Sequence, residues 1–288
     1  MRTIKRARFS VPKILFLFFP FLIFLSCATP SGVIMPELAQ PQWEVFSHDG
    51  GIACYTGKTS SPRLEYYALR IDLANADLRI CVADDSSISG KVSSFVKKNN
   101  LLAGINALPF DPVSGREGEP RTNIGLVVAG GRVISPPHPP FDALVFFTGG
   151  AAAIVPQSEI HSFENIANAA GGFYRILHNY EPAPRVSQTN SRHPRSAAGL
   201  SSDGKLLYLL VVDGRRPGSI GSTEAETAVL LRALGACDGI NFDGGGSSAL
   251  ALRYPDGKVR VVNTPVHDGI PGRERAVAGC LGVGLNSQ

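Results

Sequence analysis

Apolar and polar positions alternate over short segments in the first half of the chain. A period of two is typical of β-strands that bury one face, and short apolar runs are typical of fully buried strands. Strands are predicted at residues 64–71, 76–83, 101–106, 124–128 and 143–147. A helix is expected over residues 91–99, and polar loops are expected at 109–122 and 178–195.

The last hundred residues show a clearer order of elements. Residues 206–213 form a nearly continuous apolar run, which suits a strand buried on both faces. Residues 225–234 carry apolar side chains at helical spacing, and Gly235 follows where a helix C-cap belongs. A second short strand is predicted at 239–243. This order of strand, helix and strand predicts a βαβ unit, whose two strands normally run parallel.

Charged and glycine residues follow both strands of this unit. Asp213 ends the first strand and precedes Gly-Arg-Arg, while Asp243 ends the second and precedes Gly-Gly-Gly-Ser-Ser. Because the carboxyl ends of parallel strands meet at one edge of a sheet, both aspartates are expected there. Three consecutive glycines are entropically unfavourable in an ordered segment, so residues 244–246 indicate a tight turn or a backbone that approaches a negative group.

Together these elements predict an α+β fold with a mixed central β-sheet and flanking helices. The sheet is expected to contain the C-terminal βαβ unit and to follow a β-rich N-terminal segment. The predicted parts are a leader at 1–27, a tether at 28–41, a β-rich region at 42–100 and a main domain at 101–288.

The first 27 residues have the pattern of a bacterial export signal. Five basic residues and no acid precede an apolar run at 14–25, and Ser26-Cys27-Ala28 follows. Leu25-Ser26-Cys27 resembles a lipobox, which predicts lipidation of Cys27 and anchoring to a bacterial membrane. Simple cleavage and an uncleaved anchor are the alternatives. All three predict an exported protein, in the periplasm or on the cell surface.

Charge and cysteine content exclude several classes of function. The formal net charge of +4 is accounted for by the five basic leader residues, so the mature chain is nearly neutral. No basic cluster with interleaved aromatic residues is present, which argues against nucleic-acid binding. The remaining cysteines form no C-x-x-C pair, and carboxylates form no dense cluster. No cofactor and no metal site are therefore predicted.

The glycine segment matches neither of two common catalytic loops. The chain has no G-x-x-x-x-G-K-[ST] phosphate loop. Residues 245–249 lack the second glycine of a G-x-S-x-G nucleophile elbow, and no histidine is placed to mark a triad with Ser247 or Ser248. A serine hydrolase is therefore disfavoured.

Several segments resemble the phosphodiester glycosidase family over residues 100–285. The matching segments are P-R-S-A-A-G at 194–199, V-D-G-R at 212–215, T-x-x-E-x-A at 223–228, L-G-A at 234–236, N-F-D-G-G-G-S-S at 241–248, N-x-P at 263–265 and R-E-R at 273–275. The chain departs from the family at Asn106-Ala107-Leu108-Pro109-Phe110, where Asn-Gly-x-Phe is usual.

This resemblance implies hydrolysis of a sugar-1-phosphodiester, such as an N-acetylglucosamine-1-phosphodiester, at the anomeric carbon. It implies a carboxylate that activates water or stabilises positive charge, and donors for the phosphate oxygens. The implied catalytic residues are Asp243, Asp213 and Glu226. The implied substrate-binding residues are Asn106, Arg195, Arg215, Gly244, Gly245, Gly246, Ser247, Ser248, Asn263 and Arg275.

Each implied role has a structural alternative. Asp243-Gly244 is a common turn pair, and Thr223-x-x-Glu226 is a capping box at the start of the predicted helix. Asp213 can instead hold Arg195 or Arg215 in place. Two other functions also stay open: a glycosidase acting on ordinary exopolysaccharide linkages, and a non-catalytic carbohydrate-binding lipoprotein of the cell envelope.

Overall fold

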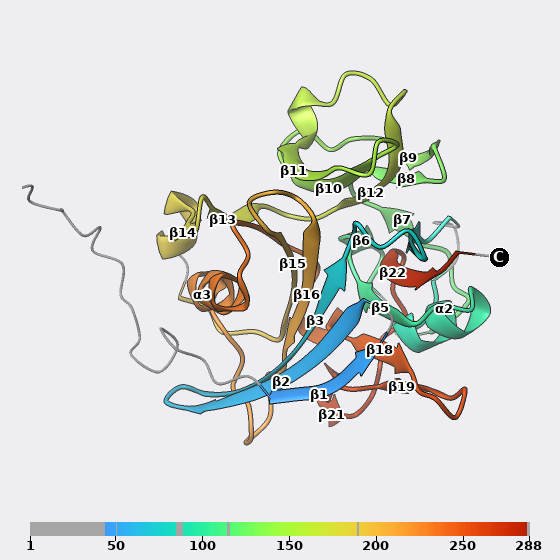
Figure 1. The fold of residues 1–288 in the computed structure, drawn as a ribbon. Coiled ribbons are helices and arrows are strands. Elements are labelled where there is room, and N and C mark those ends of the chain that lie inside the picture. Colours follow the sequence, from blue (N-terminus) through green and yellow to red (C-terminus); the bar gives the residue numbers. More distant parts are fainter. Residues whose placement is uncertain (1–43, 50, 85–88, 114–115, 189, 287–288) are drawn as a thin grey trace, which may run out of the picture. The chain divides into compact units, whose positions relative to one another are not determined.

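The structure is a computed structural model that describes residues 44–49, 51–84, 89–113, 116–188 and 190–286 (Figure 1). These residues lie in one compact unit, Ile34–Gln288. The predicted leader, the lipidation site at Cys27 and the tether lie outside the described residues. Within the described part of the chain, neither the length nor the hydropathy of any helix suffices for a membrane span.

The largest sheet has eight strands in the order β1-β2-β3-β16-β15-β17-β13-β14 (Figure 1). Its strands are β1 (Glu44–Asp49), β2 (Ile52–Ser60), β3 (Arg63–Asp72), β13 (Arg175–His178), β14 (Glu181–Pro182), β15 (Arg195–Leu200), β16 (Leu206–Val212) and β17 (Asp238–Asn241). Neighbouring strands of this sheet pair antiparallel throughout. The sheet is thus antiparallel, which corrects the expected mixed sheet.

Strand β15 lies between the two strands of the expected βαβ unit. Ala197 of β15 pairs with Leu210 of β16 on one side and with Asn241 of β17 on the other. Because β15 is antiparallel to both, β16 and β17 run in the same direction without being neighbours. The carboxyl ends of β16 and β17 and the amino end of β15 therefore lie at one edge of the sheet, and the predicted site residues gather there.

The described residues also form two five-stranded sheets and two short hairpins. One sheet has the order β11 (Ala152–Pro156), β10 (Asp142–Phe147), β12 (Ile166–Gly171), β8 (Val127–Ala129) and β9 (Arg132–Ser135). The other has the order β19 (Val259–Val261), β18 (Leu250–Arg253), β5 (Ala103–Asn106), β22 (Cys280–Leu285) and β4 (Leu78–Val82). The hairpins pair β20 (Val266–His267) with β21 (Ile270–Pro271), and β6 (Phe110–Asp111) with β7 (Thr122–Asn123).

The described residues form two α-helices, α2 (Val92–Lys98) and α3 (Glu224–Leu234), close to the predicted positions. Thr223 and Glu226 form the predicted capping box at the start of α3. Gly235 ends α3 with φ 109°, a left-handed conformation that glycine adopts without strain. Short 3₁₀ turns lie at η1 (Gln157–Glu159), η2 (Pro184–Gln188) and η3 (Gly245–Ser247).

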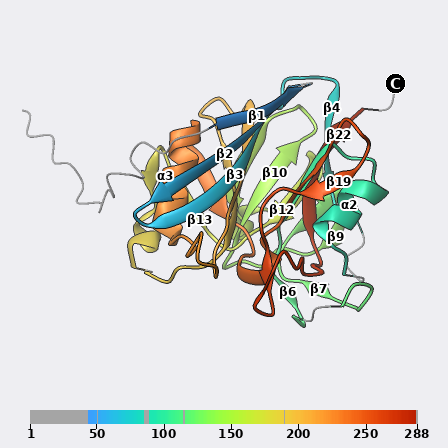
Figure 2. The ribbon, with the colours of Figure 1, turned by 90° about the horizontal axis from the view of Figure 1, so that it is seen from below.

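Both faces of the large sheet are buried, which explains the continuous apolar run of β16. Leu209 packs into a core shared with Leu144 of β10 and Ile105 of β5. Leu210, its neighbour in the chain, points to the opposite face and packs with Leu230 of α3. In Figure 2, α3 lies on one side of β2 and β3, and the green strands β10 and β12 lie on the other. The sheet is thus the middle layer of this unit.

Candidate active site

Asp243 lies where the chain passes from the large sheet to the sheet that contains β18. It follows β17 by two residues, and its backbone N–H donates to the carbonyl oxygen of Ala107 at 2.8 Å. Its carbonyl oxygen accepts a hydrogen bond from Asn106 Nδ2 at 2.6 Å. The loop that begins at Asp243 is therefore attached to the end of β5, which belongs to the other sheet.

The side chain of Asn106 is buried and joins three segments. Its Oδ1 accepts from the hydroxyl of Ser196 in β15 at 2.7 Å and from the N–H of Ala249 at 3.2 Å, while its Nδ2 binds the Asp243 carbonyl. Asn106 is 1% exposed, so it holds the loop from a buried position. Its side-chain hydrogen bonds within the protein therefore give Asn106 a structural role.

The carboxyl group of Asp243 is electrostatically unusual. Burial raises its pKa from 3.8 to about 6, because removal from water disfavours the charged form. A hydrogen bond with Ser247, the charge of Arg275 and the N–H of Gly244 act in the opposite direction. A carboxylate with a pKa near neutrality suits a general base or a proton-sharing role.

The glycines that follow Asp243 leave space for two arginine side chains. A Cβ at Gly245 would lie 2.8 Å from Arg215 Nη2, and a Cβ at Gly246 would lie 2.6 Å from Arg275 Nη2. Gly245 also has φ 63°, a conformation in which other residues are strained. The glycine run therefore provides close approach to guanidinium groups, as well as a turn.

Positive charge at this loop is not balanced by ion pairs. Arg275 donates from Nη1 to Ser247 Oγ at 3.3 Å and from Nε to His267 Nδ1 at 3.2 Å, and both acceptors are neutral or uncharged groups. Across the residues that the structure describes, neither Arg215 nor Arg275 forms an ion pair with a carboxylate. Two unpaired guanidinium groups beside a glycine loop suit an anionic ligand.

Asp213 is held by a different set of donors. Arg216 binds it at 2.6 Å, Asn263 Nδ2 binds it at 2.9 Å, and the N–H of Thr264 lies within 3.1 Å of both carboxylate oxygens. Burial raises the pKa of Asp213, and these hydrogen bonds lower it. The expected partner, Arg195 or Arg215, is wrong: the arginine that pairs with Asp213 is Arg216.

Asn263 connects this buried aspartate to the glycine loop. Besides Asp213, its Nδ2 binds the carbonyl oxygen of Ser248 at 3.1 Å, and its Oδ1 accepts from the N–H of Leu250 at 2.9 Å. Asp213 and Asn263 thus fix the end of the loop where it enters β18.

Glu226 and Arg195 bind the start of α3. Glu226 accepts from the N–H of Thr223 at 2.9 Å and from Arg192 Nη1 at 2.7 Å. Arg195 pairs with Glu224 at 3.3 Å and donates to the carbonyl oxygen of Ser222 at 3.2 Å. Their charged groups are therefore engaged by partners around the start of α3, although the backbone at Pro194 accepts a hydrogen bond from the N–H of Gly245 in the loop.

The structure brings one further residue to the site, His267, whose contact with Arg275 the sequence did not indicate. His267 lies in the β20–β21 hairpin and is 3% exposed. A histidine without a recognisable spacing to other polar residues gives no signal for such a contact.

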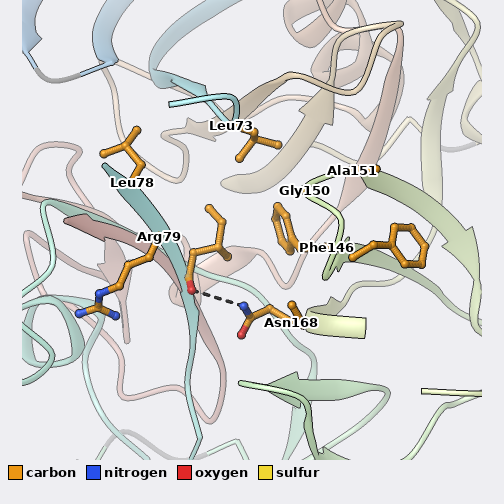
Figure 3. Close-up of a pocket in the computed structure, with 10 residues that line it drawn as sticks. Leu73, Leu78, Arg79, Phe146, Gly150, Ala151 and Asn168 are labelled. Atoms are coloured by element: carbon orange, nitrogen blue, oxygen red, sulfur yellow. Dashed lines mark hydrogen bonds between the residues drawn. The ribbon is translucent and has the colours of Figure 1, made fainter. Parts of the chain in front are cut away.

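Other features of the described residues lie apart from this site. Figure 3 shows a cavity of about 150 Å³ lined by Leu73, Leu78, Phe146 and Asn168, in which Asn168 donates to the Ile80 carbonyl at 3.4 Å. Its lining includes no residue of the glycine loop. Cys54, Cys81, Cys237 and Cys280 are free thiols. Among the described residues, His, Cys, Asp and Glu form no group of three that could hold a metal ion.

The fold and the site define a class of protein. It is a β-rich α+β protein in which a carboxylate, a glycine loop and two arginines meet at a sheet edge. The family model of the phosphodiester glycosidases matches residues 99–284, and the chain belongs to this family.

One curated protein is similar to part of this chain in sequence. The SPbeta prophage-derived uncharacterized protein YomE of Bacillus subtilis strain 168 is 33% identical over 148 residues, which cover 49% of this chain. The match covers 21% of YomE, so this chain spans only a small part of that relative's length.

Three solved structures share the fold. A hypothetical protein from Synechocystis has a TM-score of 0.64 at 14% identity, covering 85% of this chain and 64% of its own. The catalytic domain of zebrafish N-acetylglucosamine-1-phosphodiester alpha-N-acetylglucosaminidase, auto-inhibited by its pro-peptide, has a TM-score of 0.62 at 15% identity, covering 85% and 88%. A putative exported protein from Burkholderia pseudomallei has a TM-score of 0.56 at 17% identity, covering 77% and 74%.

Proposed function

We propose that this protein is a hydrolase that cleaves a sugar-1-phosphodiester at the anomeric carbon. The observation that carries the proposal is a buried Asp243 beside a glycine loop at which two arginines lie, neither of them in an ion pair within the described part of the chain. The carboxyl group, with its pKa raised to about 6, supplies the base, and Arg215 and Arg275 supply positive charge for a phosphate.

In this reaction the sugar's bond to the phosphate oxygen breaks, and water adds to the anomeric carbon. The leaving phosphate monoester carries negative charge that the two guanidinium groups stabilise as it develops. It leaves without a strong general acid, so one carboxylate suffices where other glycosidases use two. Asp243 accepts the proton of the attacking water or stabilises the positive charge on the sugar.

The other predicted residues support this centre. Asn106, Asp213 and Asn263 hold the two ends of the loop, and Ser247 bonds both Asp243 and Arg275. Glu226 and Arg195 stabilise the start of α3. We therefore assign positioning roles to all of these residues. The glycines at 244–246 leave space for the two arginine side chains and for the phosphate.

The first substrate to test is an N-acetylglucosamine-1-phosphodiester, because the zebrafish relative carries that substrate in its name. The rate of hydrolysis of this phosphodiester should be compared with that of an aryl N-acetylglucosaminide whose leaving group is of similar ability. Two charge-assisted contacts to phosphate correspond to a preference of roughly 10²–10⁴-fold for the phosphodiester. Arg215→Gln and Arg275→Gln should each reduce this preference, whereas Arg260→Gln, which removes an exposed arginine paired with Asp256, should leave it unchanged.

The outcomes separate the alternatives. Equal rates on the two substrates would favour a glycosidase of ordinary exopolysaccharide linkages. Binding of either sugar without turnover would favour a non-catalytic carbohydrate-binding protein of the envelope.

We also propose that the protein is exported and anchored to a bacterial membrane through lipidated Cys27. The basic and apolar leader and the Leu-Ser-Cys sequence support this proposal. The full-length protein should partition with membranes, and Cys27→Ala should release it or block its maturation. A soluble wild-type form that begins after Ala28 would contradict lipidation.

A further inference from the structure

We propose that His267 is a positioning residue for Arg275, and that its neutral imidazole holds the guanidinium group in the orientation in which it meets an anion. The proposal rests on the proposed function only for the identity of that anion as a substrate phosphate. The orientation itself follows from contacts within the protein.

The hydrogen bond between these side chains defines the state of the imidazole. Arg275 Nε lies 3.2 Å from His267 Nδ1, and an arginine Nε always carries a hydrogen. His267 Nδ1 is therefore the acceptor and carries no proton, so a neutral ring carries its proton on Nε2. Protonation of Nδ1 would remove the acceptor and place a second positive charge next to Arg275.

Two hydrogen bonds orient the planar guanidinium group, and the absence of a side chain at Gly246 leaves room for it. Nε binds His267, Nη1 binds Ser247 Oγ at 3.3 Å, and Nη2 lies over Gly246, where a Cβ would be 2.6 Å away. Because the group is planar and rigid, hydrogen bonds at two of its nitrogens constrain its plane as well as its position. Loss of the Nε contact leaves the group free to turn about the bond to its side chain.

The surroundings of His267 favour the neutral form. The residue is 3% exposed, and burial lowers the pKa of its side chain, with a further lowering by the charges of Arg275, Arg273 and Arg215. Asp268 Oδ2 lies 3.3 Å from Nε2 and acts in the opposite direction. The imidazole is therefore uncharged at neutral pH and available as an acceptor.

The backbone beside Arg275 is anchored independently. Glu274 accepts from the N–H of Ser93 at 2.9 Å and from its hydroxyl at 2.6 Å, which attaches this segment to the first turn of α2. Glu274 thus sets where the Arg275 side chain begins, and His267 sets where its charged end points. A change at His267 should disturb the guanidinium without detaching the segment.

The experiment compares His267→Asn with His267→Leu. Asparagine Oδ1 stands two bonds from Cβ, as Nδ1 does, and accepts a hydrogen bond without titrating, whereas leucine has no acceptor. Inorganic sulfate serves as the probe, because it stays dianionic from pH 5 to 8, and its dissociation constant is measured by calorimetry. His267→Leu should raise the sulfate Kd and the substrate KM roughly tenfold with a smaller change in kcat, and His267→Asn should stay close to wild type.

A second measurement does not depend on binding or turnover. Nitrogen-15 NMR of the imidazole at pH 7 should show His267 with Nδ1 unprotonated and Nε2 protonated. The opposite tautomer or an imidazolium would overturn the proposal, as would a wild type that fails to bind sulfate, or Asn and Leu variants that weaken sulfate binding equally. Sulfate binding with the expected variant pattern but no phosphodiester turnover would support the positioning role and contradict the proposed function instead.

Discussion

Burial of Asp243 favours its proposed role as a base but lowers the stability of the folded protein. Its burial produces a carboxyl group with a pKa of about 6, and the same burial makes its ionised form unfavourable in the folded protein. In the unfolded chain the group ionises near its ordinary value of 3.8. The folded-state pKa is raised, so the contribution of Asp243 to stability falls as the pH rises through the interval between 3.8 and about 6.

Asp243→Asn should therefore become more stable than the wild type as the pH rises. The gain in the free energy of unfolding should be near zero at pH 4. It should approach at most about 3 kcal/mol above pH 7, since one pKa unit corresponds to about 1.4 kcal/mol. Turnover should fall roughly 10²–10⁴-fold. Denaturant unfolding at the two pH values, together with kcat, measures both effects.

Asp203→Asn is the matched control for this prediction. Asp203 is exposed, and its hydrogen bonds with Ser201 and the N–H of Lys205 lower its pKa. Its contribution to stability is therefore present at neutral pH and lost in acid. This pH dependence has the opposite sign to that of Asp243. A pH-independent difference between Asp243→Asn and wild type would contradict the raised pKa.

At the scale of elements, the glycine loop is the part of the site that sequence could locate but not explain. The run at 244–246 indicated that some group approaches the backbone closely. The groups that do so, Arg215 and Arg275, lie about 30 residues before and after the run. Separate elements are commonly this far apart in a chain, so the spacing gave no signal of a contact. By contrast, the capping box of α3 was predicted because its two residues are three positions apart. Local spacing thus predicted where the helix starts, whereas the contacts of the glycine loop depend on tertiary packing.

Gly246→Ala should test what this glycine does. Gly246 does not have a positive φ, so alanine fits the backbone, but its Cβ would lie 2.6–3.0 Å from the guanidinium of Arg275. The guanidinium must move, and the KM for a phosphodiester should rise roughly tenfold through a weakened charge-assisted contact. Steady-state kinetics and the thermal midpoint measure the outcome.

Gly149→Ala provides the comparison, since its Cβ would meet no atom within 4 Å and its φ is not positive. It should leave both KM and the midpoint unchanged. If Gly246→Ala also leaves KM unchanged, Arg275 does not bind the substrate in the orientation seen here.

At the scale of the whole molecule, the site is formed between two sheets. The sequence placed the strand ends of β16 and β17 at one edge, but it did not reveal that β15 lies between them or that β5 supplies Asn106 from a different sheet. Apolar patterns specify that a strand is buried, and not which strand it pairs with. β15, in particular, begins Arg-Ser-Ala-Ala-Gly, whose small residues carry little periodic signal.

Asn106→Ala should show how strongly the two sheets depend on this link. It removes the partners of the Ser196 hydroxyl, the Ala249 N–H and the Asp243 carbonyl, all at buried or partly buried positions. Each unsatisfied buried group costs about 1–3 kcal/mol, so the free energy of unfolding should fall by about 3–5 kcal/mol. Denaturant unfolding measures it.

Asn168→Ala is the control for Asn106→Ala. Asn168 makes one hydrogen bond of 3.1 Å and one of 3.4 Å away from the site, and its loss should cost about 1 kcal/mol. Equal losses for the two variants would mean that Asn106 is an ordinary polar residue of the interior.

The hydrogen bond between Asn106 and Asp243 joins positions 137 residues apart, and this separation has a kinetic consequence. Contacts between distant parts of a chain form late, because the entropy of closing the intervening loop opposes them until much of the structure is in place. A refolding chain should therefore regain secondary structure before it regains an assembled site. The return of activity should follow the slowest folding phase, so that partly folded molecules carry an incomplete and inactive centre.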